Sequence, residues 1–157
     1  MNGKIVGGFI VLTSLLGGAA MYWLQVYGYY QPAVFKSGEE ITLTLIDGGV
    51  VEPILVEGIT GIAGDASPLH FRACFHTPLS LGLLSETFVA YANPTPLTAP
   101  NWFDCFDADK IGEALESGAA LAFLSRADVA PGIDRVVAVF SDGRAYAWHQ
   151  IAATAEK

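Results

Sequence analysis

The sequence contains one apolar run that is long enough to cross a lipid bilayer. Residues 5–26 are 22 consecutive residues without a charged side chain. A helix of that length extends about 33 Å, and the hydrocarbon core of a bilayer is about 30 Å thick. Tyr and Trp gather at the end of the run, between Tyr22 and Tyr30, where such rings favour the membrane–water boundary. We therefore expect residues 1–30 to form a transmembrane anchor with an aromatic belt, in contact with the lipid bilayer.

A cleaved secretory signal is the alternative interpretation of this run. Gly18, Ala19 and Ala20 are small enough to permit cleavage, but the apolar stretch exceeds the roughly 7–15 residues of a signal h-region, which favours an uncleaved anchor. Lys4 precedes the run and the next cation is Lys36. Because basic residues near a span stay in the cytoplasm, we expect a cytoplasmic N-terminus and a C-terminal domain outside.

Small residues recur at four-residue spacing along the expected span. This spacing lets two helices approach closely, because association in lipid depends on packing more than on expelling water. The pattern indicates that the span contacts one or more integral membrane proteins as well as lipid. The candidate packing residues are Gly3, Gly7, Thr13, Ser14, Gly17 and Gly18.

The rest of the chain is acidic and of ordinary domain size. We expect a juxtamembrane linker at residues 31–38 and one domain at residues 39–157. The formal net charge is −8, and Lys4 lies before the apolar run, so the remainder carries −9. Nucleic acid is a poor partner for such a surface, since phosphate binding needs Lys and Arg. A basic soluble protein would be attracted, although the acidity can equally serve solubility alone.

The pattern of apolar residues predicts an α+β domain with antiparallel strands and one or two helices. The segment 41–45 alternates apolar residues with threonine, as a half-buried strand does. Asp142-Gly143 lies between two apolar runs and predicts a hairpin. Asp107 or Asp109 caps a helix that Gly118 ends. We expect strands at 39–46, 50–56, 69–76, 119–124, 135–140 and 145–151, helices within 77–92 and from 107 to 118, and irregular chain at 58–67 and 93–101.

The two cysteines, Cys74 and Cys105, lie in the domain that we expect outside the cytoplasm. In an oxidising compartment an isolated pair most often forms a structural bridge. Such a loop would stabilise the fold by roughly 3–4 kcal/mol in the loop-entropy description. We expect a disulfide between them.

A metal site is the less favoured interpretation of the same region. If residues 69–76 form a strand, its outer face carries His70, Arg72, Cys74 and His76 in a row. Two imidazoles and the thiolates of Cys74 and Cys105 are suitable ligands for copper or zinc. However, Arg72 would project between them and repel a cation, and no closely spaced cysteine pair is present.

No catalytic motif was found in the sequence. It has no nucleophile elbow, no phosphate-binding glycine loop, no dinucleotide fingerprint and no zinc-protease helix. The carboxylates near residue 107 lack the spacing of a calcium loop and favour a helix N-terminus instead. We therefore expect no enzymatic activity and no cofactor.

Several segments resemble a family of short, single-span, uncharacterised proteins of Gram-negative bacteria. They are Met1-Asn2-Gly3-Lys4-Ile5, residues 21–27, Ser67-Pro68 and Arg72-Ala73-Cys74-Phe75. The resemblance implies a single-pass anchor in the inner membrane and a periplasmic domain, and it implies no activity, cofactor or catalytic residue.

Two classes of function are compatible with these features. The first is an accessory or assembly subunit of a larger membrane complex, such as a respiratory complex, whose acidic domain attracts a basic electron carrier such as cytochrome c. The second is a periplasmic thiol-redox or metal-handling factor that uses the candidate ligands named above.

Overall fold

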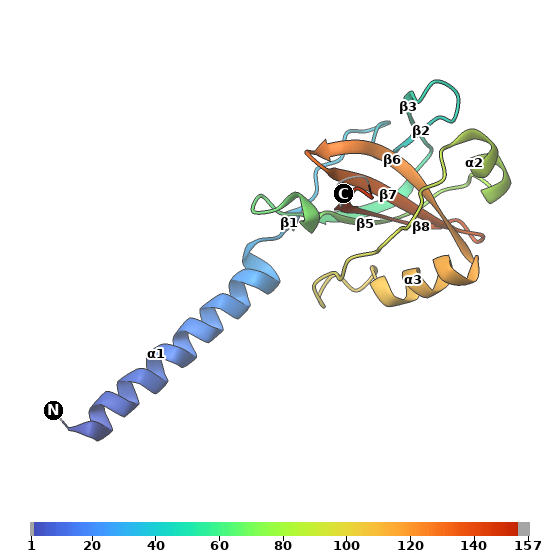
Figure 1. The fold of residues 1–157 in the computed structure, drawn as a ribbon. Coiled ribbons are helices and arrows are strands. Elements are labelled where there is room, and N and C mark those ends of the chain that lie inside the picture. The colour runs from blue at the N-terminus through green and yellow to red at the C-terminus, as the bar shows by residue number, and fades with distance from the viewer. Residues whose placement is uncertain (1, 154–157) are drawn as a thin grey trace.

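The computed structural model describes residues 2–153 and begins with a long helix that projects from the domain (Figure 1). The α-helix α1 (Gly3–Trp23) continues as one π-helical turn, η1 (Leu24–Gly28). No residue of α1 is buried, and the hydroxyl of Ser14 donates to the carbonyl of Ile10 at 2.8 Å. Hydroxyls satisfied in this way are compatible with an apolar environment.

The combined helix, Gly3–Gly28, has the length and composition needed to cross a membrane. Its 26 residues have a mean hydropathy of 1.8 in the most apolar window, and at 1.5 Å per residue they extend about 39 Å. A signal sequence near an N-terminus meets the same criteria. The finding is therefore a helix that is long and apolar enough to span.

A six-stranded antiparallel sheet forms the centre of the domain. The strand order is β1-β4-β5-β8-β7-β6, and each neighbouring pair is antiparallel. The hairpin of β7 and β8 turns at residues 141–143, as the sequence predicts. The strands are β1 (Gln31–Pro32), β4 (Glu57–Ala63), β5 (Arg72–His76), β6 (Ala120–Ala130), β7 (Ile133–Phe140) and β8 (Arg144–Ile151).

One face of the sheet is covered by the small ribbon of β2 (Thr42–Thr44) and β3 (Val51–Pro53) together with α2 (Leu81–Thr87). Leu43 and Leu84 are completely buried in one cluster with Phe75 and Val137 of the sheet and with Phe71, which directly precedes β5. The ribbon is fixed to β6 by hydrogen bonds between the hydroxyls of residues 44 and 125 and main-chain carbonyls. These residues form the larger of the two cores.

The opposite face is covered by α3 (Ala108–Ser117) and the proline-rich segment 93–101. Trp148 is completely buried there beside Phe106 and Ile111. The carboxylate of Asp107 caps α3, and Gly118 ends it with φ 77°, a left-handed conformation that glycine adopts without steric cost. The sheet is thus covered on both faces, and the expected antiparallel domain with two helices is confirmed.

Several segments differ from the sequence-based expectation, including residues 31–32, which form β1 within the expected linker, and the expected strand at 50–56, which is limited to β3. Residues 58–67 were expected to be irregular, but most of them form β4, because pairing with β5 provides order that their own pattern does not indicate. β6 continues past residue 124 to Ala130 and turns back into β7. The expected strand at 69–76 begins only at Arg72, after the 3-10 turn η2 (Pro68–His70).

Candidate functional site

A disulfide joins Cys74, on the central strand β5, to Cys105, in the loop before α3. The sulfur atoms are 2.14 Å apart and the Cα atoms 6.3 Å apart. Cys74 is buried in the second core beside Trp148, whereas Cys105 is exposed. The structure therefore contains the bridge that the sequence predicts, and this bridge ties the loop before α3 to the middle of the sheet.

The four residues considered as metal ligands have separate environments in this structure. The ring of His70 lies against Tyr30, with 4.9 Å between centroids, and Nε2 of His76 is 3.0 Å from the carbonyl oxygen of Asp142. Both cysteine sulfurs are in the disulfide. Within residues 2–153, no three His, Cys, Asp or Glu side chains are grouped to hold a metal ion.

Arg72 belongs to the fold and does not project into a ligand set. Its side chain is only 3% exposed and lies over the ring of Phe106. Burial lowers its pKa to about 10, so the guanidinium is still charged at neutral pH. It donates to four main-chain carbonyls, those of Leu69, Phe71, Leu97 and Thr98. A buried cation thus holds one end of the proline-rich segment on the sheet.

The other end of the proline-rich segment is fixed by Gln150 of β8, which is 5% exposed. Its Oε1 accepts from the main-chain N–H of Thr95 at 2.7 Å, and its Nε2 donates to the carbonyl of Asn93 at 3.2 Å. The indole N–H of Trp148 also donates to Gln150 Oε1, at 2.9 Å. With both ends held by buried side chains, the segment has a defined position beside α3.

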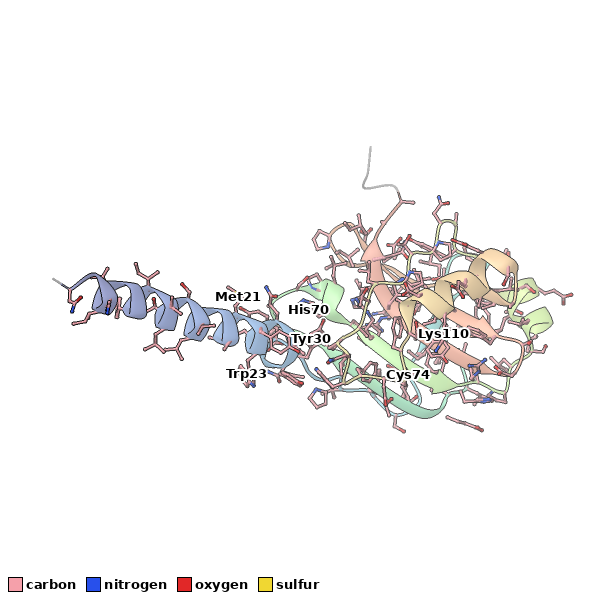
Figure 2. All side chains as sticks on the ribbon, turned by 90° about the horizontal axis from the view of Figure 1, so that it is seen from below. Met21, Trp23, Tyr30, His70, Cys74 and Lys110 are labelled. Carbon is pink, nitrogen blue, oxygen red and sulfur yellow. A yellow bond between two sulfur atoms is a disulfide. The ribbon has the colours of Figure 1, made fainter. Side chains whose placement is uncertain are left out.

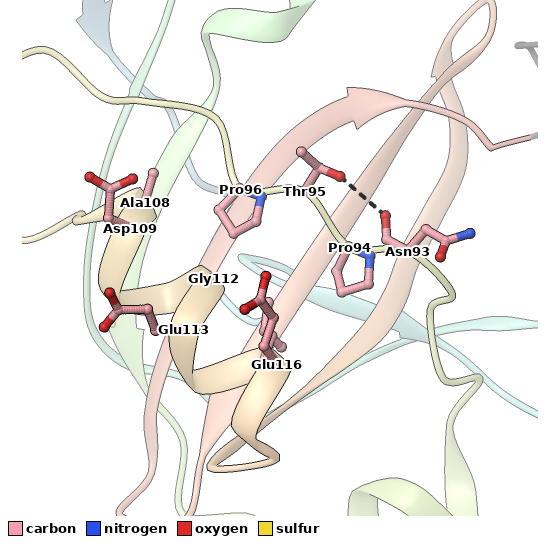
Figure 3. Close-up of a pocket in the computed structure, with 10 residues that line it drawn as sticks. Asn93, Pro94, Thr95, Pro96, Ala108, Asp109, Gly112, Glu113 and Glu116 are labelled. Carbon is pink, nitrogen blue, oxygen red and sulfur yellow. Dashed lines mark hydrogen bonds between the residues drawn. The ribbon is translucent and has the colours of Figure 1, made fainter.

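A groove of about 730 Å³ runs between this segment and α3 (Figure 3). Pro94 and Pro96 line one side, and Asp109, Glu113 and Glu116 line the other. The three acidic residues are spaced by four and three positions, so they share one face of the helix. All three are exposed. The groove therefore combines a fixed apolar wall with a row of carboxylates.

The groove carboxylates have no cationic partner among residues 2–153. The three ion pairs found there are Lys36–Glu39, Lys110–Asp107 and Arg144–Asp142, none of which includes a groove residue. Neighbouring like charges raise the free energy of the unoccupied row, and a bound cation would relieve that repulsion. The chemistry of the groove thus favours an amine or guanidinium group.

A cluster of aromatic rings joins the end of the long helix to the domain (Figure 2). The indole N–H of Trp102 donates to the carbonyl of Val26 at 2.6 Å. Its ring stacks on Tyr27, with centroids 6.2 Å apart, and meets Tyr30 edge-on at 6.0 Å. Trp102 directly follows the proline-rich segment, so the residue next to the groove wall in the chain contacts the helix.

The packing residues predicted on the helix have no partner in the described structure. Gly3, Gly7, Gly17 and Gly18 have open space where a side chain would begin, and Thr13 and Ser14 are exposed. Their role in helix association stays a prediction.

The fold defines the protein as an antiparallel α+β domain, closed by one disulfide and preceded by a long apolar helix. Residues 41–157 match a family of unknown function, DUF6446. The match covers most of the chain, and the protein belongs to this family. Membership supports the resemblance to an uncharacterised family. The matched region begins after the apolar helix. No curated protein and no solved structure matches the chain.

Sequence reasoning missed Trp102, Gln150 and the pair of Arg135 and His149. Gln150 and His149 lie in the predicted hairpin, and their inward positions could have been read from its register. Trp102 joins Val26 across 76 residues, and no sequence pattern indicates that contact.

Proposed function

We propose that the protein is a non-enzymatic accessory or assembly subunit, held by a single transmembrane helix against a larger membrane complex. The N-terminus lies in the cytoplasm, the helix spans the inner membrane, and the acidic domain lies in the periplasm. The length and apolar character of Gly3–Gly28 support the anchor, and the basic residue before it supports the orientation.

The acidic groove is the surface by which the domain would contact a partner protein. One observation carries this proposal. Three carboxylates that have no cationic partner in the described structure face the proline-rich segment, and the buried side chains of Arg72 and Gln150 hold that segment in place. A preorganised surface loses little conformational entropy on binding. A basic segment with small apolar residues fits this chemistry, because its cations meet the carboxylates and its apolar groups meet the prolines.

A respiratory complex is the proposed setting, with a basic electron carrier such as cytochrome c as a candidate partner. The charge of −9 on the chain that follows the apolar run would attract a basic protein over distances comparable to the Debye length, about 8 Å at physiological salt. Such attraction raises the rate of encounter more than the lifetime of the complex.

The groove is tested with the full chain in mild detergent and with cytochrome c as the probe at low salt. Replacing the three carboxylates (D109N/E113Q/E116Q) is expected to weaken binding about tenfold or more. The matched control removes three exposed carboxylates elsewhere (E52Q/E57Q/E86Q) and loses the same charge. An equal loss in both variants would assign the attraction to overall charge and refute the groove.

Partners of the helix are tested by replacing Gly17 and Gly18 with leucine and identifying the proteins that co-purify. Loss of integral membrane proteins from the preparation is expected, because larger side chains keep helices apart. If the same proteins still co-purified, the helix would serve only as a membrane anchor. A reporter that is active only outside the cytoplasm, fused to Lys157, tests the orientation, and a silent reporter would reverse it.

A second candidate function, in periplasmic thiol exchange or metal handling, is favoured by the position of Cys105. This residue is exposed and lines a cavity of about 320 Å³ together with Lys110, Arg144 and Tyr146. A partner thiolate can attack Sγ of Cys105 there, forming a mixed disulfide and releasing the Cys74 thiolate. A second partner thiolate then frees Cys105, leaving both cysteines reduced and the partner oxidised.

Redox titration against glutathione tests this alternative. A bridge that opens at periplasmic potentials would favour thiol exchange, whereas a bridge that resists glutathione would be structural. Copper or zinc bound stoichiometrically by the reduced protein, and lost in Cys74→Ser, would favour metal handling by His70, Cys74, His76 and Cys105.

A further inference from the structure

A cavity of about 260 Å³ lies near the end of the long helix, on the sheet face opposite the acidic groove. Its walls are mostly apolar and include Ala33, Val34 and Phe71, while its polar side chains are Arg135 and His149. The cavity also includes Pro68, two residues before His70, which Figure 2 shows beside Tyr30 at the helix end. It is therefore close to the point where the chain leaves the helix.

His149 orients the guanidinium of Arg135 without adding a charge. Nε of Arg135 donates to Nε2 of His149 at 3.0 Å, and Nδ1 of His149 lies 2.6 Å from the carbonyl oxygen of Pro68. Because Arg can only donate, Nε2 is the acceptor and Nδ1 carries the proton. His149 is 7% exposed, and its burial together with the charge of Arg135 lowers its pKa to about 4. The imidazole is therefore neutral at physiological pH.

Arg135 is a partly buried cation that lacks a carboxylate partner within residues 2–153. It packs over Phe71, with Cζ 4.4 Å from the ring centroid. Its neighbour across the β6–β7 pair is Arg126, which is also cationic. The chain after the apolar run has a formal charge of −9, so this pair of arginines is a local concentration of positive charge on an acidic protein. A planar guanidinium suits the oxygens of a phosphate group.

The position of the cavity indicates where that phosphate would come from. Val34 lines the cavity, is 97% exposed, and follows Tyr30 by four residues. Four extended residues reach at most about 14 Å, so the cavity lies within reach of a headgroup layer if the helix spans a membrane. An exposed valine beside a cationic cavity suits an amphiphile, because the valine can contact its apolar part and the cation can contact an anionic headgroup.

We propose that Arg135, positioned by His149, binds the phosphate of an anionic phospholipid headgroup, with Val34 against the apolar part of the lipid. This proposal rests on the membrane anchor of the proposed function. It assigns the domain a fixed contact with the bilayer surface, close to the aromatic cluster of Trp102, Tyr27 and Tyr30. Lipid contact would then hold the domain at a set height and leave the acidic groove free for a protein.

The test titrates the full chain in a non-ionic detergent with short-chain phosphatidylglycerol and follows the backbone amide resonance of Val34, which lines the cavity and is present in every variant, by NMR. Saturable binding is expected, weakened about tenfold or more in Arg135→Gln, since hydrogen bonds to charged groups contribute about that much. Arg135→Lys keeps the charge and is expected to bind with intermediate affinity. The matched control, Arg144→Gln, removes an exposed arginine far along the hairpin and is expected to bind like wild type.

Three outcomes would count against the proposal. Equal weakening in Arg135→Gln and Arg144→Gln would show unspecific attraction to charge. Equal affinity for phosphatidylcholine of the same chain length would remove selectivity for an anionic headgroup. Equal affinity for inorganic phosphate would assign the site to a free anion and refute the lipid as its source. Because the titration uses dispersed lipid, it can succeed even if the groove fails to bind a basic partner, so the two proposals fail separately.

Discussion

Arg72 is buried on one face of the sheet and Arg135 is half-buried on the opposite face. Their hydrogen bonding differs. Arg72 donates to four main-chain carbonyls and holds the proline-rich segment. Arg135 donates to His149 and lines an open cavity. All three nitrogens of Arg72 donate to the fold, whereas only Nε of Arg135 does. A buried cation that is engaged in this way stabilises the fold, and one whose terminal nitrogens make no bond is available to a ligand. The comparison separates a structural arginine from a candidate binding arginine.

The largest expected effect follows replacement of Arg72 by methionine, which keeps an apolar stem of similar length. Four carbonyls lose their donor, and a buried polar group without a partner is costly. We expect the free energy of unfolding to fall by on the order of 4 kcal/mol. Urea unfolding with the disulfide intact measures this loss.

Limited proteolysis gives a second measurement of the same change. Release of the proline-rich segment is expected to expose residues 93–101 to cleavage, because Arg72 holds Leu97 and Thr98 on the sheet. An unchanged urea midpoint and an uncut segment would show that Gln150 and the disulfide hold the segment alone, and Arg72 would lose its structural role.

An intermediate effect is expected from acid, through the histidine that orients Arg135. The pKa of His149 falls from 6.5 to about 4 on folding, first because of burial and then because of Arg135. Below pH 6.5 the unfolded chain therefore binds a proton that the folded chain does not. The contribution of His149 to the free energy of unfolding is therefore fully present above about pH 6.5. It is lost as the pH drops toward 4, by about 3 kcal/mol at most.

The pH dependence is measured by urea unfolding at several pH values between 4 and 7. His149→Gln retains an acceptor for Arg135 and cannot titrate, so its stability is expected to change less over this range. A wild-type curve that coincides with the His149→Gln curve would contradict the depressed pKa and the neutral imidazole.

The sequence predicted those parts of the molecule whose signals are local. The helix α3 has its cap at Asp107 and its stop at Gly118, and the turn of the last hairpin is encoded within residues 141–143. The alternation predicted for residues 69–76 correctly separates Phe71 from Cys74, which lie in different cores. Such elements need no knowledge of distant residues.

The parts that were missed depend on contacts between distant residues. β4 contains Gly61, and a side chain there would collide with the ring of Phe35 in the linker. In the sequence this glycine indicates a loop, but in the structure it lies within a strand, where close packing requires the absence of a side chain. The prediction that the proline-rich segment is irregular is confirmed. Its position as a groove wall, however, depends on Arg72 and Gln150, which belong to strands of the sheet. Only the register of the hairpin could have revealed that Arg135 faces His149.

The smallest expected effect on stability comes from Arg135→Gln, which tests the other half of the comparison. The substitution removes one hydrogen bond and one cation–π contact, so we expect a loss of about 1 kcal/mol. It also removes a positive charge that lowers the pKa of His149, so stability should fall less steeply with acid than in the wild type. Urea unfolding at pH 7 and pH 5 measures both effects. If Arg135→Gln destabilised the fold as much as Arg72→Met does, the guanidinium of Arg135 would be fully engaged by the fold, and the cavity would have no donor left for a phosphate.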